Sequence, residues 1–377
     1  MYREVFMQTR YTPRNLFTEV GYPEGFAERL IENAYHQLFE GDPVDERVCF
    51  EASDTMSYII DIGHDDIRSE GMSYGMFIAA CTGHEKMFSN LWNFSKRYLK
   101  NHEGPHKGFF SWQVSTTDFS MMDPGAAPDG EEYFAAALLI AAKKFNRRDF
   151  LEDAKALIND MMHKETNELV GPIIDPVQKM IRFSPVLGND FTDPSYHTIA
   201  FYRAFAEATG DEAWLEVAEK SIEFLNKAAH PITGLYGDYA EYDGTPKSMS
   251  WFPESNCFSG DAWRVALNLS LDYALFRGSE KERELCERLL FFFEGRRPYV
   301  SDFTVDGGLY PRTPRNATPG LIAMNAAACQ ALVQGNPLTR QFVKDLAELP
   351  IPSKFWRYYD GMLYTIGLLA TSGKISL

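Results

Sequence analysis

Two kinds of helical segment alternate along the chain, and this alternation constrains the fold more than any other feature of the sequence. Residues 133–142 (YFAAALLIAA) and 361–370 (GMLYTIGLLA) are apolar on nearly every face, so helices there must be buried on all sides. Residues 211–220 (DEAWLEVAEK) have one apolar and one charged face, which is typical of a helix that meets solvent. The all-apolar segments begin near 70, 130, 194, 260, 317 and 358, mostly about sixty residues apart.

Apolar runs with cap and stop residues predict twelve helices, at about 24–39, 70–83, 85–100, 130–145, 150–163, 194–209, 211–228, 260–277, 279–295, 317–334, 338–347 and 358–371. Six buried helices that alternate with six half-exposed ones describe an inner ring inside an outer ring, an all-α (α/α)6 barrel. A generic helical solenoid is the structural rival. We expect a single domain over residues 1–377.

The links between these helices are uneven. Short glycine-containing turns lead from each inner helix to the next outer one, as at 81–84, 208–211 and 277–279, and short links join antiparallel neighbours. The opposite links, near 101–129, 164–193, 229–259 and 296–316, are long and rich in Gly, Pro and aromatic residues. A solenoid would not have such lopsided links, so we prefer the barrel. Long loops on one rim predict that function concentrates there.

Composition argues against several classes of partner. The formal net charge of −16 disfavours nucleic acids and anionic membranes, which bind basic patches. The five cysteines are widely spread without a Cys-x-x-Cys pair, which favours unpaired thiols in a reducing compartment. The first ten residues lack the apolar core of a signal peptide, and no run of 18 apolar residues follows. We therefore expect a cytoplasmic monomer, although a signal peptide already removed would leave the same sequence.

Acids and aromatic residues stand where the buried helices begin. If all inner helices run the same way, their N-termini meet at the long-loop rim. By itself, Ser69 predicts an N-cap and Glu70 suits the positive end of a helix dipole. The starts of the other inner helices carry Pro128-Asp129, Asp193-Pro194-Ser195-Tyr196, Asp261 to Arg264, and Tyr358-Tyr359. Carboxylates and rings converging on one cleft suit glycosidic bond cleavage, in which an acid protonates the leaving oxygen and a base activates water.

Three motifs resemble the signatures of glycoside hydrolase family 8. They are residues 69–76 (SEGMSYGM), 127–134 (APDGEEYF) and 261–264 (DAWR), and the resemblance covers essentially the whole chain. The family consists of (α/α)6 barrels that hydrolyse β-1,4-linked glycans with inversion. Within it, residues 33–42, 102–108 and 123–132 are most similar to the reducing-end xylose-releasing exo-oligoxylanases. The resemblance therefore implies a xylo-oligosaccharide substrate and a catalytic domain over 1–377.

The resemblance also implies a role for each matching residue. Glu70 matches the general acid, Asp261 the general base that activates water, and Asp129 a carboxylate that holds the sugar at the cleavage site. The substrate-binding matches are Trp112 as a stacking platform, Tyr196 and Arg264 as polar contacts around the water and the sugar, and Tyr358 or Tyr359 as cleft lining. No cofactor is implied, and the eight histidines show no metal-binding spacing, so we expect no metal.

These roles make physical demands on the site. Glu70 must stay protonated near neutral pH against its helix dipole, so we expect apolar surroundings and the Asp129 carboxylate to raise its pKa. Asp261 must stay ionised, and Arg264 one turn later favours that form. Inversion also predicts a separation of about 6.5–9.5 Å between the Glu70 and Asp261 carboxyl groups, which leaves room for water.

One loop departs from the exo-oligoxylanase pattern. In those enzymes a Leu-His-Pro kink before the fifth inner helix closes the cleft, whereas residues 316–321 here read Asn-Ala-Thr-Pro-Gly-Leu. Pro319 is kept, and its fixed φ can preserve the bend, but the histidine is missing. An endo-acting β-1,4-xylanase, glucanase or chitosanase is therefore the alternative within the family. A sugar epimerase, which would need paired catalytic histidines, and a non-catalytic glycan-binding barrel are the alternatives outside it.

Overall fold

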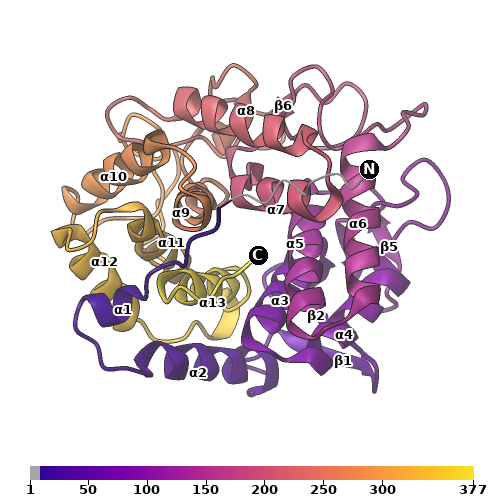
Figure 1. Cartoon of the computed structure of the whole chain (residues 1–377), viewed down its shortest axis with the longest axis horizontal. Coiled ribbons are helices and arrows are strands. Elements are labelled where there is room, and N and C mark those ends of the chain that lie inside the picture. Colours follow the sequence, from indigo (N-terminus) through magenta and orange to yellow (C-terminus); the bar gives the residue numbers. More distant parts are fainter. Residues whose placement is uncertain (1–8) are drawn as a thin grey trace.

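The computed structural model describes residues 9–377, and their helices form two concentric rings (Figure 1). The inner ring consists of α3 (Ser69–Thr82), α5 (Pro128–Lys144), α7 (Ile199–Thr209), α9 (Val265–Phe276), α11 (Pro319–Ala328) and α13 (Tyr359–Thr371). Each inner helix packs against the next, and α13 packs against α3, so the ring is closed. The predicted (α/α)6 barrel is therefore confirmed.

The outer ring alternates with the inner ring along the chain, as the sequence predicts. It consists of α2 (Phe26–Glu40), α4 (Glu85–Phe94), α6 (Arg148–His163), α8 (Ala213–Ala228), α10 (Glu280–Glu294) and α12 (Pro337–Ala347). Each of these helices buries one face, whereas nearly every side chain of α3, α5, α9, α11 and α13 is buried. The hydrophobic core therefore occupies the inner ring and the layer between the rings.

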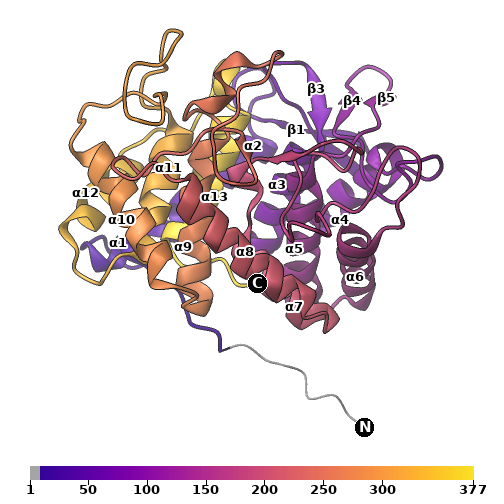
Figure 2. The ribbon, with the colours of Figure 1, turned by 90° about the horizontal axis from the view of Figure 1, so that it is seen from above.

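The two rims differ, as the unequal links predict (Figure 2). Left-handed residues end three inner helices sharply: Gly83 (φ +90°), Gly210 (φ +74°) and Arg277 (φ +54°). On the long-loop side, short strands brace the links: β1 (Cys49–Ser53), β2 (Met56–Ile59), β3 (Asp66–Arg68), β4 (Gln113–Ser115), β5 (Met121–Asp123), β6 (Phe191–Thr192) and β7 (Ala240–Glu241). β3 runs directly into α3, and Arg68 pairs with Gln113 on β4. This pairing places β4 beside the N-terminus of α3.

Several predicted helices are shorter than expected as α-helix. The 194–209 segment opens with a 3-10 turn, Pro194–Tyr196, and α7 starts only at Ile199. Side chains take the carbonyls of that first turn: Asn268 Nδ2 donates to the Ser195 carbonyl (2.7 Å) and Tyr202 Oη to the Tyr196 carbonyl (2.9 Å). The other interruptions are a π-helical turn at Ser95–Leu99 and 3-10 turns at Ala262–Arg264 and Cys329–Ala331.

A short helix, α1 (Leu16–Glu19), was not predicted, because four residues are too few to show a period. Its signal in the sequence is Asn15, whose side chain accepts from Phe17 N and Thr18 N. All five cysteines are buried and unpaired, as expected from their spacing. Among residues 9–377, no helix is long and apolar enough to cross a membrane.

Candidate active site

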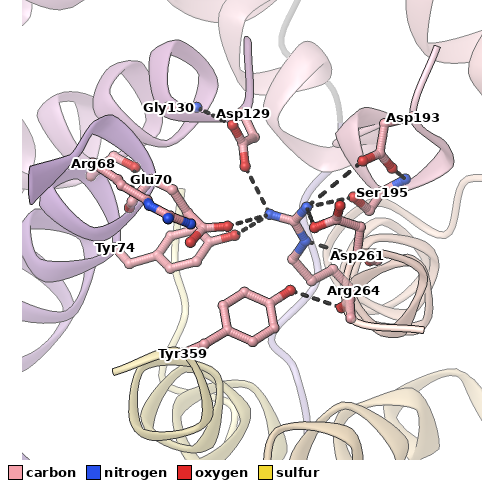
Figure 3. A network of polar contacts seen from close by, with 12 residues as sticks. Arg68, Glu70, Tyr74, Asp129, Gly130, Asp193, Ser195, Asp261, Arg264 and Tyr359 are labelled. Atoms are coloured by element: carbon pink, nitrogen blue, oxygen red, sulfur yellow. Dashed lines mark hydrogen bonds and ion pairs between the residues drawn. The ribbon is translucent and has the colours of Figure 1, made fainter. Parts of the chain in front are cut away.

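A buried arginine stands at the centre of the site, where the inner helices meet the long-loop rim (Figure 3). Arg264 is 2% exposed. Its Nη1 donates to Glu70 Oε2 (3.1 Å) and Asp129 Oδ2 (2.8 Å). Its Nη2 donates to Asp261 Oδ1 (2.7 Å) and Ser195 Oγ (2.8 Å). One guanidinium therefore joins the three carboxylates that the sequence analysis singled out, from three different inner-helix starts.

Glu70 lies in the first turn of α3, and its side chain is 16% exposed. Tyr358 Oη donates to Glu70 Oε1 (2.9 Å), and Arg264 holds the other oxygen. Burial raises the pKa of Glu70 to about 7, Arg264 opposes this, and the nearby Asp129 and Asp261 charges add to it. The expected effect of Asp129 is therefore present, but burial is the largest cause.

Ser69 does not cap α3, so that prediction is wrong. Ser69 is itself the first residue of the helix, its Oγ is buried, and it has no hydrogen-bond partner. A Cβ placed on Gly130 would lie 2.6 Å from this Oγ, which shows how closely α5 approaches α3 here. The backbone N of Ser69 donates instead to the Trp112 carbonyl (3.1 Å). Ser69 therefore serves helix packing and the attachment of the segment at Trp112, which directly precedes β4.

Asp129 and Asp261 differ in their access to solvent. Asp129 lies near the start of α5 with its side chain 4% exposed, and it accepts from Gly130 N (2.9 Å) as well as from Arg264. Burial raises the pKa of Asp129, against the opposing charge of Arg264. The side chain of Asp261 is 31% exposed, which makes it the most open of the four carboxylates paired with Arg264; the fourth is the buried Asp193, at 3.9 Å. Water can therefore reach Asp261 more readily than Glu70.

A cleft of about 440 Å³ adjoins these groups. Acids, arginines and aromatic residues are prominent in its lining. The lining residues are Arg68, Ser69, Glu70, Trp112, Asp123, Gly125, Ala126, Ala127, Asp129, Phe183, Ser184, Val186, Tyr196, Tyr239, Trp251, Asp261 and Arg264. Tyr358 and Tyr359 are not part of this lining, contrary to expectation. Tyr358 instead contacts the Glu70 carboxyl, and Tyr359 Oη donates to the Gly260 carbonyl (2.8 Å) beside Asp261.

Several functional neighbours were missed from the sequence. Tyr74 Oη lies 2.6 Å from Arg264 Nη1, and its position one turn after Glu70 in the first motif could have indicated this. Arg68 pairs with Asp66 (2.9 Å) at the mouth of the cleft. Tyr239 and Trp251 come from irregular links that have no periodic signal, and Trp251 is 59% exposed.

No group of three or more His, Cys, Asp or Glu side chains within residues 9–377 is arranged to hold a metal ion. The polar groups that line the cleft include carboxylates, tyrosines and arginines. A closed double ring of helices whose rim presents paired acids in an aromatic cleft defines an (α/α)6-barrel enzyme of the glycosidase type.

Comparisons with known proteins identify the family. The model of glycosyl hydrolases family 8 matches residues 59–373, and the chain belongs to this family. A reducing-end xylose-releasing exo-oligoxylanase of Paenibacillus barcinonensis is 36% identical, with 96% of each chain covered. Its structure in complex with xylose has a TM-score of 0.89 and covers 97% of each chain.

Two further relatives carry different enzyme names. A reducing-end xylose-releasing exo-oligoxylanase of Halalkalibacterium halodurans is 36% identical, with 97% of this chain and 94% of the relative covered. A xylanase of Teredinibacter turnerae, solved as a xylohexaose complex of a catalytic mutant, is 34% identical with a TM-score of 0.89, covering 96% of this chain and 97% of that one. The chain is thus similar to enzymes described both as exo-oligoxylanases and as a xylanase.

Proposed function

We propose that the chain is an inverting glycoside hydrolase that releases xylose from the reducing end of β-1,4-linked xylo-oligosaccharides. The observation that carries the proposal is the bridge through Arg264, which holds Glu70 and Asp261 to opposite ends of one guanidinium at the edge of an aromatic cleft. The similarity to exo-oligoxylanases over nearly the whole chain supports the substrate class.

In this mechanism Glu70 is the general acid. With a pKa of about 7, its carboxyl group is protonated over the acidic and near-neutral range and can protonate the glycosidic oxygen. Asp261 is the general base: it accepts a proton from a water molecule that attacks the anomeric carbon from the opposite face. Arg264 orients Asp261 through the 2.7 Å contact between its Nη2 and Oδ1 of the carboxylate.

The geometry limits how far apart these two groups can be. Because the terminal nitrogens of a guanidinium form a rigid fork, the bonded oxygens of Glu70 and Asp261 are at most about 8 Å apart. Inverting glycosidases separate their carboxyl groups by about 6.5–9.5 Å. The upper limit is compatible with a water molecule held between base and sugar.

The remaining predicted residues act on the sugar. Asp129 would hold sugar hydroxyls at the cleavage site, and Trp112 would stack on a sugar face, since flat apolar rings suit pyranose rings. Tyr196 would add a polar contact from its place in the cleft lining. Tyr358 would orient the Glu70 carboxyl, and Tyr359 would brace the backbone beside Asp261.

The second candidate function is endo-acting xylan cleavage. The observation that favours it is the loop at Thr318, where the exo-oligoxylanase pattern has histidine. Thr318 Oγ1 faces its own helix start and contacts Ser301 Oγ (3.2 Å), so it offers no polar stop comparable to an imidazole. The similarity to the xylanase of Teredinibacter turnerae supports the same alternative.

Three further properties belong to the proposal. We place the enzyme in the cytoplasm, where imported oligosaccharides rather than insoluble xylan would be its substrate. Five buried thiols that form no disulfide bond fit a reducing compartment. We propose that it acts as a monomer. We also propose that residues 1–377 form one catalytic domain.

Digestion of a xylo-oligosaccharide ladder tests the activity. The exo reading predicts xylose plus the chain shortened by one unit at every length, with the label released as xylose when the reducing end is labelled. Mixed mid-chain products would instead establish the endo alternative. Proton NMR of the first products should show the α-anomer at the new reducing end, and an initial β-anomer would refute inversion. Glu70→Gln and Asp261→Asn should each lose activity by orders of magnitude.

A further inference from the structure

The turn that carries Asp261 has no helix cap of its own. Asp261 stands at the N-cap position of the 3-10 turn Ala262–Arg264, which leads into α9, yet its side chain accepts no hydrogen bond from that helix start. Its backbone is right-handed helical (φ −71°, ψ −43°), whereas an N-cap residue is usually extended. Its carboxylate instead accepts a hydrogen bond from Arg264, and Asp261 lines the cleft.

A second aspartate on the same rim behaves in the opposite way. Asp193 precedes the 3-10 turn Pro194–Tyr196, has an extended backbone (φ −102°, ψ 121°), and accepts from Ser195 N at 2.6 Å. Its Oδ1 is therefore used on its own helix start, its Oδ2 lies 3.9 Å from Arg264 Nη2, and the residue is fully buried. The comparison shows what an aspartate at such a start does when nothing else occupies the neighbouring N–H groups.

At the Asp261 turn another carboxylate accepts from the N–H groups that flank Asp261. Asp238 Oδ1 accepts from Ala262 N (2.9 Å) and from Ser259 N (3.2 Å), and its Oδ2 makes a short contact with Ser259 Oγ. Asp238 is 1% exposed and comes from the link between α8 and α9, where its own N donates to the Cys257 carbonyl (2.9 Å). Asp238 thus binds the backbone on both sides of Asp261, at Ser259 and at Ala262.

We infer that Asp238 is a positioning residue for the reaction: it caps the turn from outside, so that the carboxylate of Asp261 is left free to activate water. The inference rests on the proposed function, in which Asp261 is the base. Asp238 is absent from the cleft lining, and its contacts are to the turn rather than to the place of the sugar.

The location of this acid is unfavourable for stability, which argues against a purely structural role. Burial raises the pKa of Asp238 to about 7, and the charge of Asp261 adds to the increase. A buried acid kept beside another acid destabilises the ionised fold, and such local conflicts are expected where function requires them.

The contacts predict which substitutions are tolerated. Asparagine can reproduce all three, because its Oδ1 can accept from both N–H groups and its Nδ2 can donate to Ser259 Oγ. Alanine leaves Ala262 N without an acceptor. The carboxylate of Asp261 is then the adjacent acceptor. Turning toward Ala262 N, as Asp129 turns toward Gly130 N (2.9 Å), would take it away from the water.

Steady-state kinetics of Asp238→Ala and Asp238→Asn test the inference, with Asp238→Ser as a second variant should the alanine variant fail to fold. We expect kcat of the alanine and serine variants to fall about 10- to 100-fold, because small misplacements of a catalytic group have effects of that size. KM should stay within about twofold, and asparagine should restore kcat to within about threefold of the parent. A crystal structure of the alanine variant should show the Asp261 carboxylate bonded to Ala262 N.

Asp272→Asn is the matched control. Asp272 is also fully buried, but it pairs with Arg203 (2.7 Å) near the other end of α9, so its substitution should lower the melting temperature without this loss of kcat. A folded alanine or serine variant with unchanged kcat would overturn the inference, as would an asparagine variant as impaired as the alanine one. Full activity of Asp261→Asn would instead refute the proposed function, so the two failures are distinguishable.

Discussion

Glu70→Gln is expected to make the protein more stable at neutral pH while it abolishes activity. The pKa of Glu70 is raised from 4.5 to about 7, so the folded protein holds this proton more tightly than the unfolded chain. Below pH 4.5 Glu70 is protonated in both the folded and the unfolded state, and the carboxyl group does not lower the free energy of unfolding. As the pH rises from 4.5 to 7, the parent loses stability that the glutamine variant keeps. The 16% exposure of the side chain means that solvent screens little of this effect.

The size of the effect follows from the shift. A rise of this extent corresponds to about 3 kcal/mol of unfolding free energy by pH 8. Urea unfolding of parent and variant at pH 5, 6, 7 and 8 measures the difference. It should grow in favour of the variant by about 2.5 kcal/mol across this range, because part of the effect is already present at pH 5. Glu24→Gln, at an exposed position, is the control and should show no such trend. A parent-to-variant difference that stays constant with pH would refute the electrostatic reasoning.

The remaining predictions concern activity. The kcat/KM of the parent should fall as the pH rises through about 7, because Glu70 must be protonated. Asp129→Asn removes a charge that raises the pKa of Glu70, so the pH–rate profile of this variant should show the fall at lower pH. Arg264→Met should lower kcat by at least about 100-fold and destabilise the fold by about 3–5 kcal/mol in chemical unfolding, since it leaves buried carboxylates unpaired. Trp112→Ala should raise KM about tenfold on short oligosaccharides while the melting temperature stays nearly constant, because a stacking ring is worth about 0.5–1.5 kcal/mol beyond its buried area.

The barrel was predictable because burial on all sides leaves a direct trace in the sequence. Helices such as α5 and α13 are buried on nearly every face. The spacing of such helices along the sequence sets the alternation of inner and outer helices. The acids were predictable for a related reason, since each stands at the start of such a helix. The family resemblance then ordered Glu70, Asp129 and Asp261 into one site.

What could not be predicted depends on contacts between segments far apart in the chain. Ser69 has the composition of a cap, but the close approach of α5 at Gly130 decides what its hydroxyl meets. Tyr239 and Trp251 reach the cleft from links whose course no periodicity describes. Asp238 is one acid among many in such a link, and only its contacts with Ser259 and Ala262 set it apart.

The bridge through Arg264 has a consequence for the cycle of the proposed enzyme. Hydrolysis takes the proton from Glu70 to the leaving sugar and a second proton from water to Asp261, so each turnover ends with the two carboxyl groups in exchanged protonation states. The guanidinium has no proton to lend, because it does not deprotonate in proteins. Recovery must therefore pass through solvent: Asp261, 31% exposed, can release its proton directly, but Glu70, at 16%, depends on water entering the cleft. Departure of the products therefore also lets Glu70 regain its proton. While the product sugar is still bound, the enzyme lacks the proton that the next cleavage needs.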